Sequence, residues 1–417
     1  MPENYTIDMP EAVRNIIHTI EEHGFKAYAV GGCIRDSILG RNPDDWDITT
    51  SAVPSQIKTF FKRTVDTGIA HGTVTIMIDK TGYEVTTYRI DGEYEDGRHP
   101  KSVEFSDRLV DDLCRRDFTI NAMAYNDTDG FVDEFKGLDD LDTKIIRCVG
   151  EPELRFTEDA LRMMRAIRFS AQLGFTIDEA TWNAIKKLAP SINKISMERV
   201  HVELGKTLMS AHPDYVAQYS EAGLFAPILP VIDNALKSRY KRKILATLQH
   251  TPDNIYLRYA ALFITSTPDE AAKTLRALKL DNKTVDTVSK LVELSKMDIE
   301  ETEPAVRTAL NKYGRDFLPL WHELMMAVIQ ASEDTTGISN PAKVKHLLTL
   351  KRLGTDILAR GDCFTIKDLD ISGNDLIEYG LQGHEIGETL KSLLDIVIEN
   401  PKLNDKTTLI AMIEHIK

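Results

Sequence analysis

The spacing of apolar residues predicts a mixed region of helices and strands at the start of the chain. Between Pro10 and Gly24 the apolar residues recur at helical spacing, which predicts an amphipathic helix. Runs of alternating and β-branched residues then predict strands at 26–30, 46–50, 73–79 and 83–89. We expect a hairpin turn at 80–82 and short helices at 34–39 and 55–61. The first third of the chain is therefore predicted to be a small α+β unit.

Beyond about residue 150 the pattern changes to helical periodicity. We expect helices at 157–173, 179–188, 197–209, 269–278 and 284–295. No fixed repeat period or low-complexity tract is visible in the sequence. The predicted fold is an α+β head, built from a small mixed sheet with helices, followed by an all-α remainder.

The chain is acidic, because 65 Asp and Glu residues outnumber 51 Lys and Arg residues and give a formal net charge of −14. This balance argues against a protein that binds nucleic acid or membranes by bulk positive charge. The four cysteines form no C-x-x-C pair, so neither a zinc ribbon nor a disulfide framework is predicted. No apolar run approaches the roughly 18–20 residues that span a bilayer, and we expect a cytoplasmic protein.

Two short groups of residues in the predicted head have side chains or backbone suited to chemistry. Gly31 and Gly32 follow a strand and open a helix, where N–H groups can hold a phosphate; a plain tight turn is the alternative. Asp45 and Asp47 lie two positions apart on a predicted strand, so both carboxylates share one face. Such a pair suits a divalent metal ion, and the alternative is an exposed strand end. Glu84 on a neighbouring strand could add a third carboxylate, or simply face solvent.

The order of the motifs resembles a known enzyme family. Gly-Gly-x-x-Arg-Asp at 31–36, followed by Asp-x-Asp at 45–47, resembles the head of the nucleotidyltransferase superfamily. Two further stretches, 115–124 beginning Arg-Arg-Asp and 158–169 beginning Glu-Asp-Ala-Leu-Arg, resemble the class II CCA-adding enzymes and the related bacterial poly(A) polymerases. The resemblance covers about residues 25–205.

The resemblance implies roles for particular residues. Asp45 and Asp47 would hold Mg²⁺, with Glu84 as the third carboxylate that helps to activate an attacking hydroxyl. It implies nucleotide contacts for seven residues: Gly32, Arg35, Arg116, Asp159, Arg162, Arg165 and Arg168. For Arg116, a local ion pair with Asp117 or Asp112 is the alternative. The arginines at 162, 165 and 168 recur every third residue and would form a broad cationic stripe on one helix.

Asp159 and Arg162 suggest how such a protein could distinguish bases. Three positions apart on one predicted helix, they would lie on the same face. A carboxylate only accepts hydrogen bonds and a guanidinium only donates them, so the pair matches the edges of cytosine and adenine. The alternative is an intrahelical salt bridge on a wet surface.

Three polar or charged segments complete the prediction. Residues 91–100 resemble the flexible loop with which CCA-adding enzymes pass from C to A addition, and a surface connector is the alternative. Residues 237–243 and 343–352 each carry several cations and no anion, so they could contact tRNA phosphates in an otherwise acidic chain. The alternative for each segment, and the more common case for such a segment, is a solvated helix face.

The resulting hypothesis is a CCA-adding tRNA nucleotidyltransferase that uses CTP and ATP with Mg²⁺, needs no nucleic-acid template and releases pyrophosphate. The expected domains are a catalytic head at 1–145, a base-recognising helical neck at 146–210, a body at 211–300 and a tRNA-binding tail at 301–417. The expected partners are tRNA, ATP and CTP but no membrane, and the chain is expected to be a monomer or a homodimer. The alternatives are a poly(A) polymerase, an enzyme adding only CC or only A, and an RNA-binding protein on an inactive head.

Overall fold

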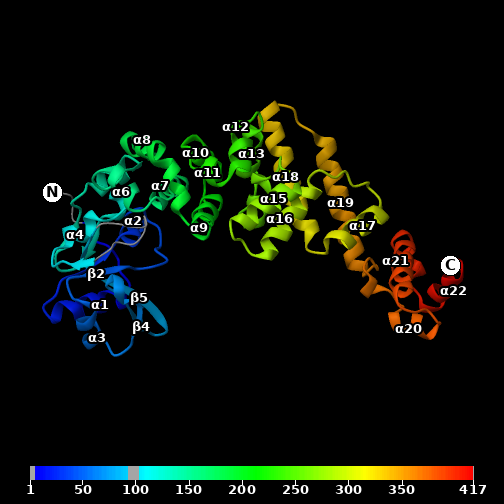
Figure 1. Ribbon diagram of the computed structural model, residues 1–417, viewed down its shortest axis with the longest axis horizontal. Helices are drawn as coiled ribbons and strands as arrows, with labels where there is room; N and C mark the ends of the chain where they lie inside the picture. Colours follow the sequence, from blue (N-terminus) through cyan, green and yellow to red (C-terminus); the bar gives the residue numbers. More distant parts are fainter. Residues whose placement is uncertain (1–4, 93–102, 417) are drawn as a thin grey trace. The chain divides into compact units, whose positions relative to one another are not determined.

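The computed structural model describes residues 5–92 and 103–416, and the chain separates into two compact units (Figure 1). Unit 1 is Met1–Pro230 and unit 2 is Val231–Lys417. Unit 1 contains the sheet and several helices, whereas the described residues of unit 2 form helices and connections only. The predicted α+β head followed by an all-α remainder is therefore confirmed.

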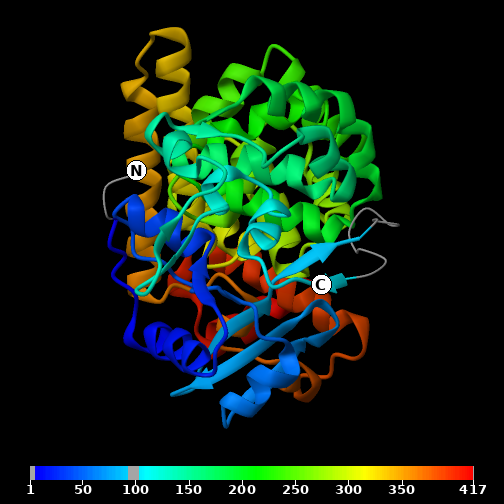
Figure 2. The ribbon, with the colours of Figure 1, turned by 90° about the vertical axis from the view of Figure 1, so that its left-hand side faces the viewer.

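A mixed sheet of seven strands organises the N-terminal part of unit 1 (Figure 2). In spatial order its strands are β3 (Thr64–Gly68), β4 (Thr73–Ile78), β5 (Thr81–Thr87), β2 (Ile48–Thr50), β1 (Ala27–Val30), β8 (Ala124–Asn126) and β9 (Gly130–Val132). Strand β1 runs antiparallel to both of its neighbours, and β2 runs parallel to β5. This topology places the start of β2 and the end of β1 beside each other at one edge of the head.

The interior strand β1 is buried along its whole length because helices cover both faces of the sheet at this point. Helix α1 (Glu11–Glu22) packs its apolar stripe against β1 and also contacts α3 (Pro54–Phe60). Tyr28 and Val30 alternate to the other face, where they join a core cluster with Leu113 of α4 (Leu109–Cys114). Helix α2 (Gly32–Ile38) follows β1 directly, as the sequence predicts.

The β4–β5 hairpin turns earlier than expected. Ile78 pairs with Thr81, so the turn consists of Asp79 and Lys80 alone, with φ angles of 47° and 72°. Two successive positive φ values are typical of the tight turn that matches the twist of paired strands. The prediction of a turn at 80–82 was wrong because Gly82 pairs within the hairpin, where a Cβ would come 2.8 Å from Thr75 Cγ2.

The helix expected at 157–173 is two helices. Helix α6 (Pro152–Glu158) ends before Asp159, whose φ of −143° and ψ of 104° are extended, and α7 (Leu161–Leu173) follows. The Asp159 carboxylate accepts a hydrogen bond from the Leu161 amide at 3.0 Å. A short acidic side chain that bonds a nearby amide competes with helix continuation, which explains the break.

Helices dominate the rest of unit 1 and the described part of unit 2, and those at 179–188, 197–208, 268–277 and 282–294 lie where the sequence predicts helices. Unit 1 also contains two two-stranded sheets, one of β6 (Arg89–Asp91) and β7 (Val103–Phe105) and one of β10 (Ile145–Ile146) and β11 (Thr176–Ile177). Unit 1 continues with α5 (Gly137–Asp142), α8 (Glu179–Leu188), α9 (Met197–Leu208), α10 (Ala217–Glu221) and α11 (Phe225–Ile228). From the boundary onward the helices are α12 (Pro230–Lys237), α13 (Lys241–His250), α14 (Ile255–Leu262), α15 (Pro268–Ala277), α16 (Asn282–Leu294), α17 (Glu303–Tyr313), α18 (Phe317–Thr336), α19 (Pro341–Arg360), α20 (Gly373–Glu378), α21 (His384–Glu399) and α22 (Lys406–Ile416). The last three share a separate apolar core that includes Leu376, Leu393 and Leu409.

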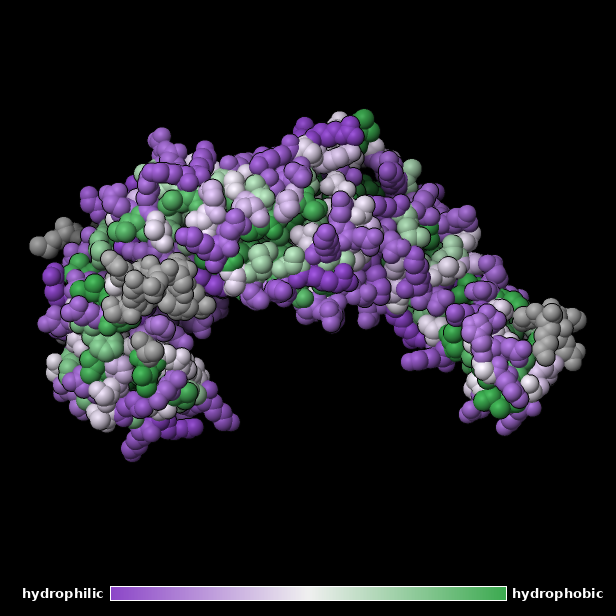
Figure 3. All heavy atoms as spheres, in the orientation of Figure 1, coloured by the Kyte–Doolittle hydropathy of each residue, from purple (hydrophilic) through white to green (hydrophobic). Residues whose placement is uncertain are grey.

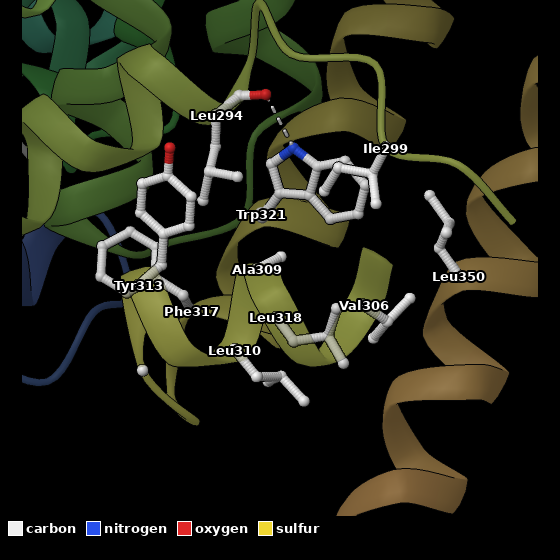
Figure 4. A pocket seen from close by; sticks show the side chains of 11 residues that line it. Leu294, Ile299, Val306, Ala309, Leu310, Tyr313, Phe317, Leu318, Trp321 and Leu350 are labelled. Carbon is white, nitrogen blue, oxygen red and sulfur yellow. Dashed lines mark hydrogen bonds between the residues drawn. The ribbon is translucent and has the colours of Figure 1, made fainter. Parts of the chain in front are cut away.

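Unit 2 contains a small apolar cavity of about 20 Å³ among α17, α18 and α19 (Figure 4). Aliphatic and aromatic side chains surround it, and Trp321 Nε1 donates a hydrogen bond to the Leu294 carbonyl oxygen at 3.2 Å. A void of this size without polar groups is expected to stay dry. We regard it as a gap in the core packing rather than as a binding site. Hydrophilic side chains predominate on the face of the molecule that Figure 3 shows.

Candidate functional site

The turn from β1 into α2 lies directly against the side chain of an arginine from another part of unit 1. Gly31 has a φ of 86° and a ψ of −129°, a conformation that residues with a Cβ rarely adopt. A Cβ on Gly31 would come 2.9 Å from Arg116 Nη1. Arg116 is held there by Asp112 of α4, whose Oδ2 accepts from Arg116 Nη2 at 3.0 Å. The Arg116 Nε is buried without a hydrogen-bond partner among the described residues.

Asp45 and Asp47 project from an extended run beside this turn. The expected strand at 46–50 begins only at Ile48, but the Asp47 carbonyl oxygen still accepts from Val30 N at 3.0 Å. Exposure alternates along the run: both aspartates are exposed and Trp46 between them is buried. The two carboxylates therefore share one side, as predicted, although strict strand geometry does not extend to them.

The Asp47 carboxylate interacts electrostatically with Arg116 and with Asp45. Although the Asp47 side chain is exposed, the protein around it displaces part of its hydration, and this desolvation raises the pKa of Asp47. The positive charge of Arg116 lowers this pKa, and the negative charge of Asp45 raises it. The sum is a raised pKa, so Arg116 only partly compensates the pair of carboxylates. Two acidic groups with one incomplete counter-charge suit a bound cation.

Glu84 lies on β5 at the register position beside Asp47. Val85 pairs with Ile48 in the parallel β2–β5 ladder, and Glu84 precedes Val85 as Asp47 precedes Ile48. Its side chain is exposed. Within 5–92 and 103–416, however, no three His, Cys, Asp or Glu side chains lie close enough together to hold a metal ion. The role of Glu84 stays a prediction.

A polar network joins the Arg115–Asp117 region to α7. Asp117 is buried, and its Oδ2 accepts from Arg165 Nε at 2.7 Å while its Oδ1 accepts from Asn121 Nδ2 at 3.1 Å. Arg35 Nη1 in turn donates to Asn121 Oδ1 at 2.6 Å. Burial by itself would raise the pKa of Asp117, but the charge of Arg165 and the Asn121 hydrogen bond outweigh it and lower this pKa. Asp117 therefore stays ionised and holds Arg165 in place.

Three of the predicted nucleotide-binding arginines lie close to the ring of one phenylalanine. The guanidinium carbons of Arg35, Arg165 and Arg168 lie 5.1, 5.3 and 3.9 Å from the centroid of the Phe169 ring. Arg168 is buried and its Nε donates to Glu203 Oε2 at 2.5 Å. Burial lowers the pKa of Arg168 more than Glu203 raises it. Of the expected stripe, Arg165 is the most accessible member, with 34% of its side chain exposed.

Asp159 and Arg162 do not share one helix face as predicted, because Asp159 lies in the break before α7. Both Asp159 oxygens are held by Arg199 of α9, at 3.2 Å from Nη1 and 2.7 Å from Nη2. Arg162 donates to Glu158 Oε2 at 2.5 Å and to the Arg115 carbonyl oxygen at 3.0 Å. The backbone of the Arg115–Asp117 segment thus connects Arg162 with the region that holds Arg116.

Four residues of this network were not predicted as site residues from the sequence: Asn121, Phe169, Arg199 and Glu203. Asn121 and Phe169 stand inside the quoted stretches 115–124 and 158–169, so the motifs contained a signal for them. Arg199 and Glu203 stand in a predicted helix with no motif, and only their contacts with Asp159 and Arg168 reveal them.

Other expectations concern regions around the site. Residues 93–100 of the expected loop lie outside the described residues; the flanking strands β6 (Arg89–Asp91) and β7 (Val103–Phe105) pair with each other. All four cysteines are free, and Cys114 alone among them is exposed. Among the described helices, none combines the length and apolar character that crossing a membrane requires.

Comparisons with known proteins find matches along most of the chain. Family models described as "Poly A polymerase head domain", "Probable RNA and SrmB-binding site of polymerase A" and "tRNA nucleotidyltransferase domain 2 putative" match residues 27–147, 174–236 and 253–413. A CCA-adding enzyme of Limosilactobacillus reuteri is 49% identical over 230 residues, which are 54% of this chain and 56% of that protein, so this match spans about half of its length.

Two further relatives match along nearly the full length. A CCA-adding enzyme of Limosilactobacillus fermentum is 37% identical over 407 residues, which are 96% of this chain and 95% of that protein. The crystal structure of the Bacillus stearothermophilus CCA-adding enzyme in complex with CTP has a TM-score of 0.75 and 32% identity, covering 97% of this chain and 96% of that one. With matches of this identity and extent, the chain belongs to the family of CCA-adding enzymes, which are nucleotidyltransferases.

Proposed function

We propose that this protein adds or repairs the 3′-terminal CCA of tRNA, using CTP and ATP without a nucleic-acid template. The proposal rests on the contacts of the Arg115–Asp117 segment. This segment contacts both the carboxylate pair and the arginines of α7. The Arg116 side chain lies against Gly31 and acts on Asp47, whereas Asp117 binds Arg165. One short segment thus couples the carboxylate pair to the arginines of α7, as joint binding of a metal and a triphosphate requires.

The donor set of the carboxylate pair fits Mg²⁺, a hard cation that prefers oxygen ligands. Asp45 and Asp47 are both exposed, adjacent and only partly compensated by Arg116. When bound there, Mg²⁺ would stabilise negative charge on the phosphate oxygens and favour deprotonation of the attacking hydroxyl. We propose Glu84 as the residue that accepts the proton of the tRNA 3′-hydroxyl, because it occupies the neighbouring register position.

The nucleotide phosphates are proposed to bind near the arginine cluster. Arg165 is partly exposed, so it can donate to triphosphate oxygens while Asp117 keeps its guanidinium oriented. Arg35 and Arg168 are more buried, and we propose that they shape the cluster around Phe169 and add positive potential. The backbone of Gly32, at the start of α2, is proposed to lie against the same ligand.

Base selection is proposed to rest on Asp159 and Arg162. Cytosine and adenine both present an amino donor beside a ring nitrogen acceptor, which a carboxylate and a guanidinium can satisfy. Both groups already make charged hydrogen bonds within the protein, with Arg199 and Glu158. A base with the opposite order of donor and acceptor would place a donor against the Arg162 guanidinium or an acceptor against the Asp159 carboxylate. The unsatisfied groups would then oppose binding of that base.

Contacts with tRNA are proposed for the two basic segments in unit 2. Residues 237–243 connect α12 to α13, and residues 343–352 lie within α19. Neutralising the first segment is expected to weaken tRNA binding and to flatten its salt dependence, whereas unchanged affinity across salt concentrations would reject the contact. The four-domain division, the cytoplasmic location and a monomeric or homodimeric state stay predictions.

The decisive experiment supplies tRNAs that end before CCA, after the first C and after CC, each with single nucleotides, and sequences the products. CCA completion with CTP and ATP is expected, and Asp45→Asn should abolish it. Long A tails would favour the poly(A) polymerase alternative, and failure to incorporate any nucleotide would overturn the proposal. Exchanging Asp159 and Arg162 should shift preference from CTP and ATP toward UTP and GTP; an unchanged preference would refute the base-reading role.

A further inference from the structure

Unit 2 contains an open cavity of about 510 Å³ that the proposed reaction does not use. Helices α13, α18 and α19 and the residues that follow α16 form its walls. Its volume falls within the range of small-molecule sites, roughly 300–1,000 Å³. The cavity has a basic side and an apolar side, and each indicates one part of the ligand.

Three lysines from different elements line the basic side: Lys243 of α13, Lys296 after α16 and Lys343 of α19. Lys243 and Lys343 come from the two basic segments that the sequence analysis singled out, and the fold brings both to one cavity. Within the described part of the chain, neither ammonium group makes an ion pair or hydrogen bond. All three lysines are exposed, so water screens their charges, and an anion bound among them would gain charge-assisted contacts from three different elements.

Lys296 is partly desolvated and also lies within electrostatic reach of Lys243. Its Nζ donates to the Ser266 carbonyl oxygen, which adds no negative charge. Burial lowers the pKa of Lys296, the carboxylate of Glu270 raises it and the charge of Lys243 lowers it again. The balance is a lowered pKa, so the protein leaves the positive charge at this side incompletely compensated.

The acidic groups at the cavity do not neutralise these lysines. Asp298 is the carboxylate residue that lines it, and Asp298 Oδ1 lies 3.8 Å from Nε2 of His346. His346 Nδ1 also lies 2.8 Å from Glu301 Oε1. The positive end of α19, a helix of 20 residues capped by Asn340, faces the same cavity and also favours an anion.

The apolar side of the cavity is formed by well-packed side chains. Met325, Val328 and Ile329 of α18 line it together with Trp321. The Trp321 indole is 3% exposed, fixed by its hydrogen bond to Leu294, and also borders the small apolar cavity of Figure 4. A flat, weakly polar group placed here would exchange water for well-ordered side chains.

We propose that this cavity is a second nucleotide site, which binds the phosphate of a free nucleoside phosphate with Lys243, Lys296 and Lys343 and its base against the apolar side. An inorganic anion would leave the apolar side wet, and a purely apolar ligand would leave the lysines uncompensated. In a double-stranded RNA segment the bases are paired, so they cannot reach the floor of a concave cavity. The inference is independent of the proposed function of unit 1.

The test is calorimetric titration of the full-length protein with adenosine 5′-monophosphate, which has no pyrophosphate to release. In Lys243→Ser/Lys343→Ser the affinity of this site is expected to fall about tenfold or more, because two charge-assisted contacts are lost. Lys283→Ser is the matched control, since Lys283 is exposed on α16, does not line the cavity and lies outside both basic segments. Thermal denaturation of each variant verifies the fold.

Two further arms separate the possible outcomes. Arg162→Ala should weaken any binding in unit 1 and leave the second site intact, and inorganic phosphate should bind more weakly than the nucleotide. The proposal is overturned if the double variant binds the nucleotide like the wild type. It is also overturned if the double variant loses affinity for tRNA but keeps its affinity for the nucleotide, because the cavity would then be an RNA contact.

Discussion

The guanidinium of Arg116 lies so close to Gly31 that a Cβ on this glycine would come 2.9 Å from Nη1. The contact joins the β1–α2 turn to an arginine 85 positions later in the sequence, and the same arginine acts on Asp47. The glycine is required here for two reasons: its positive φ and the space that Arg116 occupies. The position of Arg116 therefore depends on the absence of a side chain.

Replacing Gly31 with alanine should displace Arg116. We expect kcat/KM to fall by about a hundredfold, because small displacements of positioning groups are costly to catalysis. Gly24→Ala is the matched control, since Gly24 has a φ of 84° and open space around it. Both changes should lower stability by about 1–3 kcal/mol through backbone strain. Equal activities of the two variants, measured by incorporation of CTP into tRNA, would contradict this role of Arg116.

Removing Arg199 should impair base selection. Arg199 holds both carboxylate oxygens of Asp159, so Arg199→Ala frees that carboxylate to rotate. We expect kcat/KM for CTP and ATP to fall by about tenfold or more, with partial retention in Arg199→Lys, which keeps the charge but not the two parallel hydrogen bonds. Steady-state kinetics with each of the four triphosphates measure the effect.

Lys187→Ala is the control for Arg199, because the Lys187–Glu153 pair is an exposed ion pair within unit 1. This control should behave like the wild-type protein. If Arg199→Ala retained full activity and selectivity, Asp159 would not need Arg199 for its orientation.

Arg307 should be important for the stability of unit 2. Its side chain is 2% exposed, and it donates to the Ile398 carbonyl oxygen at 2.7 Å and to Asp362 Oδ2 at 2.9 Å. Arg307→Ala removes the donor of the Ile398 carbonyl oxygen and leaves Asp362 with the exposed Arg360 as its cationic partner, and we expect a loss of about 3–5 kcal/mol in the free energy of unfolding. Urea denaturation measures this loss.

Arg360 provides the comparison, because it also binds Asp362 but is 46% exposed. Solvent replaces the contacts of an exposed arginine, so Arg360→Ala should change stability much less than Arg307→Ala. Similar losses for the two variants would show that burial of Arg307 is not the source of its effect.

His322 should make unit 2 sensitive to acid. Burial lowers the pKa of His322 from its ordinary value of 6.5, and the charge of Lys351 lowers it further. Its Nε2 also has no hydrogen-bond partner among the described residues. Because the unfolded chain binds a proton at this histidine more readily than the folded one, stability present above 6.5 is lost progressively as the pH falls below it.

The measurement is the melting temperature of the wild type and of His322→Leu between about pH 8 and about pH 5. The wild type should lose more stability than the variant over this interval, since protonation of the carboxylates affects both equally. Parallel curves for the two proteins would rule out His322 as the cause.

The sequence predicted much of the head because the relevant signals are local. The apolar spacing between Pro10 and Gly24 predicted α1, and the alternation around Trp46 predicted that Asp45 and Asp47 share one side. The break at Asp159 and the two-residue turn at Asp79 were missed, since a carboxylate that caps the next helix and a lysine with positive φ have no distinct periodicity.

What the sequence alone determined is therefore the order of elements, the class of the fold and the motifs that carry the chemistry. Only the tertiary structure decided which groups meet: Arg116 with Gly31, Arg199 with Asp159, and the lysines of two separate basic segments with one cavity. The physical reason is that periodicity reflects the environment of each residue along its own helix or strand. The partner of a side chain depends instead on how elements distant in the sequence pack together.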